Sequence, residues 1–307
     1  MSTAREVVDG VDLTGKTCVI TGASAGLGRE SARALAAAGA HVILAARNMV
    51  ALDEAQQWIE AESPGARTSL VALDLTSLAG VRTAAAAIAE LAPSIDVLMN
   101  NAGVMFTPFA RTADGFENQF GTNHLGHFEL TRLLRPQLTG ARIVILSSDG
   151  HHMSDVDLDD PNWERREYDK FAAYGASKTA NILHMVELNR RYADAGVHAV
   201  AVHPGVVGTS LARHMTRDDF GALRSMAADN RDKGAVLDSL LTPEQGAATQ
   251  VWAATAPELD GAGAVLDHAL CMRQFPDEGL WSNRVAQGLL TLPEVDRLAH
   301  RLASFHQ

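Results

Sequence analysis

The stretch TCVITGASAGLG, residues 17–28, decides the fold of this chain. Its first five residues form a short apolar run that predicts a buried strand, and the pattern that follows Gly28 predicts an amphipathic helix. A glycine-rich turn between a strand and a helix presents backbone N–H groups and the positive end of the helix to a phosphate group. The order of strand, turn and helix therefore predicts a dinucleotide site, and the alternative is a glycine-rich connection in a sheet protein.

Beyond this stretch, short apolar runs alternate with amphipathic helical patterns as far as about residue 267. Such alternation is typical of βαβ units that build a parallel sheet. The seven predicted strands are residues 17–21, 41–46, 68–73, 96–100, 142–147, 197–202 and 263–267. Their nearly continuous apolar character suits a sheet covered by helices on both faces. No repeat or linker divides the chain, so we predict one α/β domain over residues 1–307.

Three segments interrupt or follow this alternation. Residues 149–171 form a polar insert, and residues 210–241 break the alternation a second time. Both follow the carboxyl ends of predicted strands, where open α/β sheets bind their ligands, so we expect two substrate-covering loops. Residues 277–307 resume an amphipathic helical pattern, and we expect a C-terminal helical extension that covers the sheet edge or the pocket.

The charge of the chain limits its partners. It has 26 basic and 37 acidic residues and a net charge of −11, which opposes binding to nucleic acid or to an anionic membrane surface. A small-molecule partner is expected instead.

The two cysteines, Cys18 and Cys271, support neither a disulfide framework nor a cysteine metal cluster. With no apolar signal core and no apolar run near the roughly 18 residues of a membrane helix, the sequence predicts a cytoplasmic protein.

Histidines and acidic residues raise the question of a metal site. His151 and His152 are adjacent, but neighbouring side chains rarely converge on one ion without a distant third ligand, and none is identifiable. The acidic stretch 155–160 lacks the glycine and the terminal glutamate of an EF-hand loop. We therefore expect no metal, and interpret the histidines as polar loop residues near a substrate entrance and the acidic stretch as a solvated flap.

A second informative stretch is YGASK, residues 174–178. Tyr174 and Lys178 are four residues apart, about one helical turn. An ammonium near a phenol favours the phenolate, so we expect the pKa of Tyr174 to fall below its ordinary value of about 10. Tyr174 is therefore a candidate general acid or base, although most pairs with this spacing lie on helix surfaces.

The residues after the second predicted strand bear on the choice of cofactor. A nucleotide-binding fold usually places an acid there to accept hydrogen bonds from the ribose hydroxyls, but this chain has Ala45-Ala46-Arg47-Asn48. Arg47 can pair with a 2′-phosphate and Ser24 can add a hydroxyl donor, which favours NADP over NAD. The alternative for Arg47 is an ordinary surface arginine at a helix start.

Two further turns follow predicted strands. Asp74, with Leu75 beside it, could accept a hydrogen bond from the adenine amino group, or Asp74 could cap the helix that follows. Asn100-Asn101-Ala102-Gly103 combines small residues with turn-forming amides, which would allow a cofactor to lie against the backbone. As a bare NNAG, the second of these could also be only a turn.

Four motifs, TGASAGLG, NNAG, the pair Ser147-Ser148 and YGASK, occur in this order and together resemble the classical short-chain dehydrogenase/reductase family. The likeness covers roughly residues 14–270. Residues 123–128 (NHLGHF), the serine pair followed by His151-His152, and residues 203–207 (HPGVV) are most similar to its retinol dehydrogenase and WW-domain oxidoreductase branch, and protochlorophyllide reductases are similar too. The resemblance implies a Rossmann fold with a seven-stranded parallel sheet.

The resemblance also implies roles for individual residues. A tyrosine at the position of Tyr174 exchanges the substrate proton, while Lys178 lowers its pKa and hydrogen-bonds the nicotinamide ribose. Ser148, favoured over Ser147, orients the substrate oxygen, and alternation along the strand sends the two hydroxyls to opposite faces. Asn123 holds a water that relays protons from Lys178, and its alternative is an amide that satisfies a local backbone kink.

By the same resemblance, the turn that contains Val207 and Thr209 binds the nicotinamide carboxamide. The expected cofactor-binding residues are Gly22, Ser24, Gly26, Leu27, Gly28, Arg47, Asp74, Leu75, Asn101, Ala102, Gly103, Tyr174, Lys178, Val207 and Thr209. The expected reaction is NADP(H)-dependent interconversion of a ketone or aldehyde and an alcohol on a hydrophobic small molecule. A C=C or C=N reductase and a catalytically silent NADP-binding sensor stay open. So does a homo-oligomer, since the family often forms dimers or tetramers.

Overall fold

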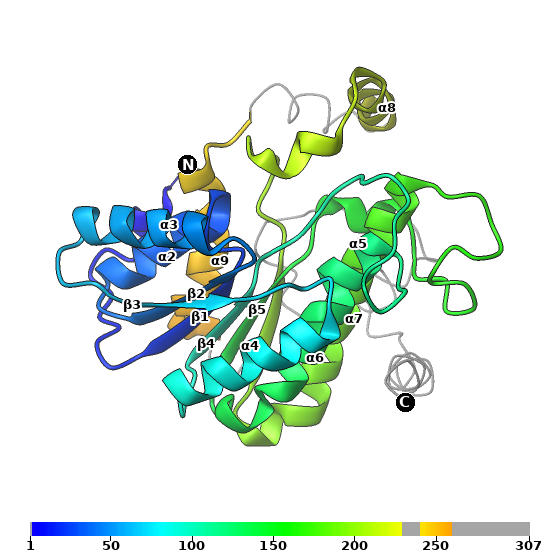
Figure 1. Cartoon of the computed structure of the whole chain (residues 1–307). Helices are drawn as coiled ribbons and strands as arrows, with labels where there is room; N and C mark the ends of the chain where they lie inside the picture. Colours follow the sequence, from blue (N-terminus) through cyan, green and yellow to red (C-terminus); the bar gives the residue numbers. More distant parts are fainter. Residues whose placement is uncertain (1, 229–239, 260–307) are drawn as a thin grey trace.

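The computed structural model describes residues 2–228 and 240–259, in which a parallel sheet lies between two layers of helices (Figure 1). The strands are β1 (Thr17–Thr21), β2 (His41–Ala46), β3 (Arg67–Ala72), β4 (Val97–Asn100), β5 (Arg142–Leu146) and β6 (His198–Val202). They lie in the order β3-β2-β1-β4-β5-β6, and every pair is parallel. The predicted strand 263–267 and the predicted extension 277–307 lie outside the described residues, so the described sheet has six strands where the sequence predicts seven.

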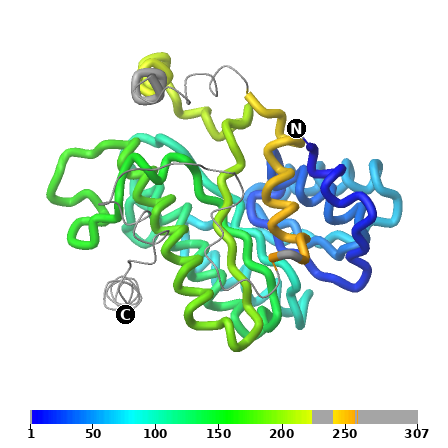
Figure 2. Tube along the Cα trace, turned by 180° about the vertical axis from the view of Figure 1, so that it is seen from behind, coloured from blue at the N-terminus to red at the C-terminus, as the bar shows by residue number. Residues whose placement is uncertain are grey.

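Helices cover both faces of the sheet, as predicted. One face carries α1 (Ala4–Val7), α2 (Gly26–Ala37), α3 (Met49–Glu62) and α9 (Pro243–Thr255). The other carries α4 (Leu78–Leu91), α6 (Gly126–Leu133) and α7 (Lys170–Tyr192). Figure 2 shows α9 beside the N-terminal helices, so segments far apart in the sequence pack together. The remaining helical segments are α5 (Asn118–Phe120), the π-helical η1 (Gly121–Leu125), α8 (Arg217–Ala228) and the 3₁₀ turns η2 (Arg135–Gln137), η3 (Asp149–Met153), η4 (Ala193–Ala195), η5 (Ser210–His214) and η6 (Pro257–Leu259).

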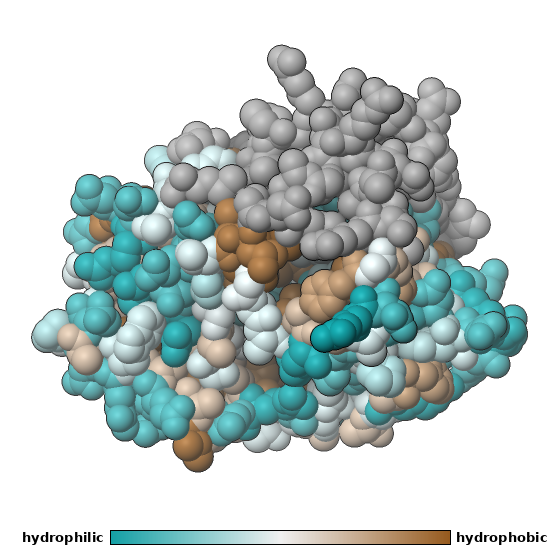
Figure 3. Space-filling view, turned by 90° about the horizontal axis from the view of Figure 1, so that it is seen from above, coloured by the Kyte–Doolittle hydropathy of each residue, from teal (hydrophilic) through white to brown (hydrophobic). Residues whose placement is uncertain are grey.

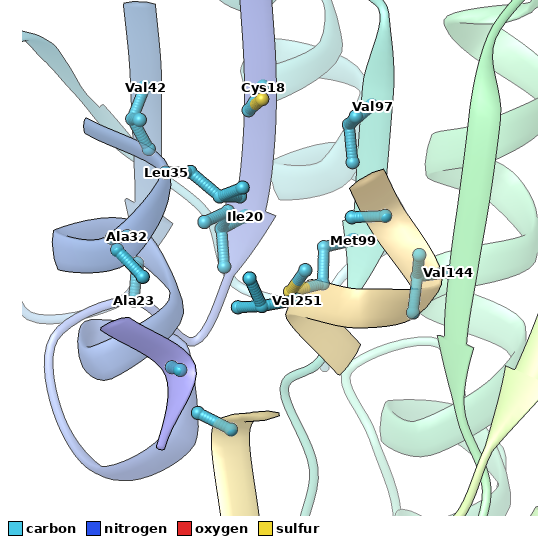
Figure 4. Close-up of a cluster of buried hydrophobic side chains, with 14 of the residues drawn as sticks. Cys18, Ile20, Ala23, Ala32, Leu35, Val42, Val97, Met99, Val144 and Val251 are labelled. Atoms are coloured by element: carbon cyan, nitrogen blue, oxygen red, sulfur yellow. The ribbon is translucent and has the colours of Figure 1, made fainter. Parts of the chain in front are cut away.

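Alternation along β1 explains why the strand is apolar throughout. Cys18 and Ile20 point into the core beneath α2 and α9, where Leu35 and Val251 also lie (Figure 4). Val19 points into the opposite core, beneath α4, α6 and α7. Because both faces of the strand are covered, neither set of alternating positions can be polar. Burial raises the pKa of the Cys18 thiol to about 12, so this cysteine is an unreactive core residue.

Side-chain caps fix where several helices begin. Asn48 accepts hydrogen bonds from two backbone N–H groups at the start of α3, and Ser77 does the same for one such group of α4. Asp169 caps α7, which places Tyr174 in the second turn of that helix. Thr242 and Gln245 form a capping box at α9.

None of the helices within the described ranges is both long enough and apolar enough to cross a bilayer.

The strand order creates a crevice between β1 and β4. From β1 the chain adds strands outward to β3, then returns to the other side of β1 and adds β4 to β6. Open α/β sheets bind their ligands at such a reversal, beside the carboxyl ends of the strands. The turns that leave β1 and β4 touch there, since a Cβ atom added at Gly22 would stand 2.9 Å from the Cα atom of Ala102.

Candidate active site

A cleft of about 2330 Å³ lies at the carboxyl edge of the sheet, walled by the segments that follow the six strands and by η5 and α8. All of the predicted cofactor-binding residues line it, together with Ser148. Asn123 is the one predicted site residue outside this lining, and it is fully buried. Viewed from above, a group of apolar side chains is visible near the middle of the molecule, with hydrophilic side chains to its left and right (Figure 3).

The side chains of Ser148 and Tyr174 lie close together, since a Cβ atom at Gly150 would stand 2.6 Å from Cε1 of Tyr174 and 3.4 Å from Oγ of Ser148. Ser148 also caps η3, where its hydroxyl accepts a hydrogen bond from the N–H of Gly150 at 3.1 Å. Its neighbour Ser147 instead donates to the carbonyl oxygen of Lys178 at 3.1 Å. The two serine hydroxyls therefore have different surroundings, and it is Ser148 that meets the tyrosine.

Tyr174 is 3% exposed, and this burial is the largest influence on the pKa of its hydroxyl. Desolvation raises the pKa of Tyr174 to about 12, and the hydrogen bond with Ser148 acts in the opposite direction. The spacing of Tyr174 and Lys178 predicts a lowered pKa for the tyrosine, and for the protein by itself that prediction is wrong. The reason is burial, which Lys178 does not offset: its Nζ donates to the carbonyl oxygen of Leu146 at 3.0 Å and lies 5.6 Å from the centre of the tyrosine ring.

Lys178 is buried between Tyr174 and Asn123. Burial lowers the pKa of Lys178 to about 8, since an ammonium loses hydration there. The backbone of Gly103 passes close by: a Cβ atom at this glycine would stand 3.8 Å from Nζ of Lys178 and 3.1 Å from Oδ1 of Asn123. Gly103 thus leaves room for the lysine and asparagine to lie on the same side of the cleft wall.

Asn123 belongs to η1, a π-helical turn. Its Oδ1 accepts a hydrogen bond from the N–H of Val104 at 2.8 Å, and its Nδ2 donates to the Val104 carbonyl at 2.9 Å and to Ser177 Oγ at 3.0 Å. The amide therefore satisfies local backbone groups, as the alternative for this residue expects. Single π-helical turns within helices are frequent at functional sites.

The glycine-rich turn after β1 packs directly on the NNAG turn after β4. A Cβ atom at Gly28 would stand 2.4 Å from the carbonyl oxygen of Gly22, so a larger residue does not fit there. Asn101 Nδ2 donates to the Thr21 carbonyl at 2.7 Å. Thr209 reaches this turn from η5, since its Cγ2 stands 3.5 Å from the Cβ position of Gly26. Val207 is held beside it by a bridge to Leu241.

At the far end of the cleft, Arg47 is exposed and has no hydrogen-bond or ion-pair partner among the described residues. Asp74 uses Oδ1 to accept hydrogen bonds from the N–H of Thr76 at 2.9 Å and from its hydroxyl at 2.7 Å. The helix that follows is capped by Ser77, so the helix-capping alternative for Asp74 is wrong. Ser24 and Leu75 lie in the same wall.

Phe106 is a residue of this site that the sequence analysis missed. Its φ angle is 51°, a left-handed conformation that is unusual for a bulky side chain, and its N–H donates to Gln119 Oε1 at 2.7 Å. The ring lies edge-on to Tyr174, with centroids 5.1 Å apart, and against Phe171 at 4.5 Å. No local sequence signal announces this backbone conformation.

The polar insert 149–171 lines the cleft only near its two ends. In its middle, Val156 and Leu158 pack against a hydrophobic cluster that contains Phe120 and Leu183. Asp160 is buried and accepts hydrogen bonds from two backbone N–H groups. This middle part is therefore packed on α5 and α7, in contrast to the solvated flap interpreted from the sequence.

The second predicted substrate-covering segment forms η5 and α8 over its described part, and residues 229–239 lie outside the described ranges. Leu211, Met215, Phe220 and Leu223 line the cleft from this side. An ion pair of 2.6 Å joins Lys170 Nζ at the start of α7 to Asp219 Oδ1 in α8. Within residues 2–228 and 240–259, no group of three or more histidine, cysteine or acidic residues is arranged to hold a metal ion.

Comparison with known proteins agrees with this geometry. A family model described as short chain dehydrogenase matches residues 16–219. Human retinol dehydrogenase 13 is 45% identical over 205 residues, 66% of this chain and 62% of that protein, so this chain spans less than two thirds of that relative. A probable oxidoreductase of Streptomyces lividans is 40% identical over 294 residues, 94% of this chain and 96% of that protein.

Solved structures of short-chain dehydrogenases are also similar to this chain. The Pseudomonas aeruginosa RhlG/NADP active-site complex is similar with a TM-score of 0.61 and 26% identity, over 80% of this chain and 91% of that chain. The family predicted from four sequence motifs is thus confirmed. This protein belongs to the short-chain dehydrogenase/reductase family of oxidoreductases, in its retinol dehydrogenase-like branch.

Proposed function

We propose that this protein uses NADP(H) to interconvert a ketone or aldehyde and an alcohol on a hydrophobic small molecule, with Tyr174 as the acid/base. One observation carries the proposal: the neighbouring side chains of Ser148 and Tyr174 line the same cleft as the glycine-rich turn. A substrate oxygen that meets both hydroxyls is oriented and supplied with a proton at one place. Lys178 and Asn123 lie directly behind this pair.

The residues of the chain divide the work in the reducing direction. A bound nicotinamide supplies the hydride, and the turns at Gly22, Asn101 and Thr209 would hold it. Ser148 donates a hydrogen bond to the substrate oxygen. Tyr174, whose raised pKa keeps it protonated at neutral pH, then gives its proton to that oxygen. The phenolate left on Tyr174 would be stabilised by the ammonium of Lys178 once Nζ turns from the Leu146 carbonyl toward it.

The preference for NADP rests on Arg47. An exposed guanidinium without a protein partner is free to make a bidentate contact with a phosphate, and Ser24 is placed in the same wall. Because Ala46 ends β2 and Arg47 follows it, no carboxylate stands at the position where an acid would bind the ribose hydroxyls. Both features favour the 2′-phosphate.

The preference for a hydrophobic substrate rests on apolar side chains that line the cleft. Phe106 and Phe171 form the aromatic part of this lining, and Met215, Phe220 and Leu241 continue it. Apolar walls of this kind bind apolar ligands, while the few polar groups fix orientation. The roles of Asn123, Ser148, Tyr174 and Lys178, the substrate-covering role of the two segments, and a cytoplasmic location of the protein are parts of this proposal.

The test is NADPH oxidation by the purified protein against a panel of aromatic, terpenoid and steroid ketones and aldehydes, with matched alkenes and imines beside them. We expect turnover of carbonyls and at least tenfold lower kcat/KM with the alkenes and imines. Turnover of only C=C or C=N bonds would replace the carbonyl assignment. Tight NADPH binding with no turnover would favour a sensor, and sedimentation of the same sample reports whether it forms a homo-oligomer.

A further inference from the structure

His127 lies between the cofactor turn and Asn123 and has no part in the mechanism above. It stands in α6, is 1% exposed, and has a partner at each ring nitrogen. Nε2 is 2.8 Å from the Thr21 hydroxyl oxygen, and Nδ1 is 2.9 Å from the carbonyl oxygen of Asn123. Burial lowers the pKa of His127 to about 4, so at neutral pH the ring is neutral and carries a single proton.

The partners of Thr21 decide which nitrogen carries that proton. Its hydroxyl oxygen accepts hydrogen bonds from the backbone N–H groups of residues 101 and 102, at 2.9 and 3.0 Å, which occupy both lone pairs. The hydroxyl hydrogen must then be donated, and His127 Nε2 at 2.8 Å is closer than the Met99 carbonyl at 3.4 Å. Because the Asn123 carbonyl can only accept, Nδ1 carries the ring proton.

The two ends of this hydrogen-bond chain belong to different parts of the site. Thr21 ends β1 and holds the NNAG turn against Gly22. Asn123 lies in the π-helical turn, and its side chain holds both backbone groups of Val104. His127 therefore connects the turns that receive the cofactor with the segment that carries the buried amide.

We propose that His127 is a positioning residue: by donating to the Asn123 carbonyl and accepting from Thr21, it fixes the Asn123 segment relative to the cofactor-binding turns. Asn123 then keeps its place beside Lys178, behind the Ser148–Tyr174 pair. The effect on turnover rests on the proposed function, whereas the hydrogen-bond chain itself does not.

The position of the ring proton tests the chain directly. The full-length protein, labelled with ¹⁵N in histidine, is followed by NMR from pH 7.5 to 5, and the His127→Asn variant assigns the signal. We expect a neutral ring with its proton on Nδ1 throughout this range. A proton on Nε2, or a ring that becomes charged above pH 5, would overturn the proposal, whether or not the protein turns over any carbonyl.

Kinetics test the consequence. His127→Phe removes both hydrogen bonds, whereas His127→Asn keeps an N–H close to the position of Nδ1. We expect His127→Phe to lower kcat about tenfold or more with the Kd for NADPH within about threefold, and His127→Asn to recover most of the loss. His184→Phe is the matched control, because His184 is also buried with a lowered pKa and packs against the rings of His124 and Phe128. That control should retain kcat.

Thr21 gives a second approach to the same chain if His127→Phe does not fold. Thr21→Val removes the hydroxyl and should lower kcat and weaken NADPH binding, because it also releases residues 101 and 102, while Thr21→Ser should restore both. Equal losses for His127→Phe and His127→Asn, or an equal loss for His184→Phe, would contradict the positioning role. If the wild-type protein consumes no NADPH with any carbonyl, the proposed function fails and the NMR result alone decides the role of His127.

Discussion

Gly150 lies directly against the ring of Tyr174. A Cβ atom at Gly150 would stand 2.6 Å from Cε1 and 2.9 Å from Cδ1 of that ring. A second glycine completes the contact, since a Cβ atom at Gly175 would stand 2.8 Å from the carbonyl oxygen of Gly150. The two glycines let η3 and α7 approach closely enough for the Ser148 hydroxyl to act on the pKa of Tyr174. The position of Tyr174 therefore depends on Gly150, which lies outside the YGASK motif, as well as on Gly175 within it.

Gly150→Ala should displace the Tyr174 ring. The added methyl group cannot occupy the 2.6 Å gap, so the tyrosine or the start of η3 must move. Overpacking of this kind costs about 1–3 kcal/mol of unfolding free energy. We expect kcat to fall about tenfold or more, with the Kd for NADPH nearly unchanged.

Urea unfolding, NADPH titration and steady-state kinetics measure these effects. Gly221→Ala serves as the control, because a Cβ atom there meets no heavy atom within 4 Å. An unaltered kcat in Gly150→Ala would show that the close contact does not hold the tyrosine in place.

Exchange of Ala46→Asp together with Arg47→Ile should move cofactor preference toward NAD. The change removes the guanidinium that can pair with a 2′-phosphate and adds a carboxylate for the ribose hydroxyls. We expect the ratio of kcat/KM for NADPH over NADH to fall about tenfold or more. Arg47→Ile alone should weaken only NADPH, so NADH kinetics are the internal control. A ratio that stays at the wild-type value would remove Arg47 from the cofactor site.

Loss of the ion pair between Lys170 and Asp219 should affect substrate binding. The pair joins α7 to α8 across the substrate side of the cleft at 2.6 Å, and both groups retain some exposure, so its contribution is at most about 1 kcal/mol. We expect Lys170→Met to raise KM for a hydrophobic substrate about two- to fivefold without changing the Kd for NADPH.

The exchanged pair Lys170→Asp with Asp219→Lys supplies the control for this effect. It should return KM toward the wild-type value if attraction between the two side chains matters. Equal KM values for the wild type and for Lys170→Met would mean that α8 is positioned by other contacts.

Three buried histidines should make the protein sensitive to mild acid. Burial lowers the pKa of His124 and His127 to about 4, and that of His184 well below its ordinary value. Unfolded histidine titrates near about 6.5, so below that pH the unfolded chain binds more protons than the folded one. Stability is therefore constant above this range and falls as pH drops from about 6.5 toward 4.

Urea unfolding at pH 7.5 and at pH 5 measures this loss. Each histidine should lower the unfolding free energy by about 2 kcal/mol between the two pH values. The reason is that pH 5 lies about 1.5 units below the pKa of unfolded histidine, and each unit corresponds to about 1.4 kcal/mol. The His184→Phe variant should lose correspondingly less than the wild type. Identical unfolding free energies at both pH values would mean that these rings accept protons in the folded state.

Most of the described fold could be predicted because four of the described strands, β1, β2, β4 and β5, are almost completely buried. The predicted run 17–21 coincides with β1, and the prediction 68–73 differs from β3 (Arg67–Ala72) by one residue at each end. A continuous apolar run indicates a buried strand, so such strands can be located without knowing which segments pack against them. The prediction of a solvated flap for the acidic stretch 155–160 differs from the structure, because Val156 and Leu158 pack against residues distant in sequence. Local polarity does not reveal such a contact.

The candidate site could be predicted as a set of motifs but not as an arrangement. Backbone turns at Gly22 and Asn101 follow from local composition. The left-handed conformation of Phe106 depends on Gln119, and the pairing of His127 with Thr21 joins residues 106 positions apart. The raised pKa of Tyr174 reflects burial, which spacing within a helix cannot report. Such properties arise only when distant segments meet.

Tyr174→Phe shows whether Tyr174 exchanges the substrate proton, since the variant keeps the ring and removes the hydroxyl. Tyr192→Phe, in the same helix but outside the cleft lining, is the matched control. We expect Tyr174→Phe to bind NADPH with a Kd within about twofold of the wild type while kcat falls by roughly 10²–10⁴. A kcat close to that of the wild type, with NADPH still bound, would contradict the assignment of Tyr174 as the acid/base.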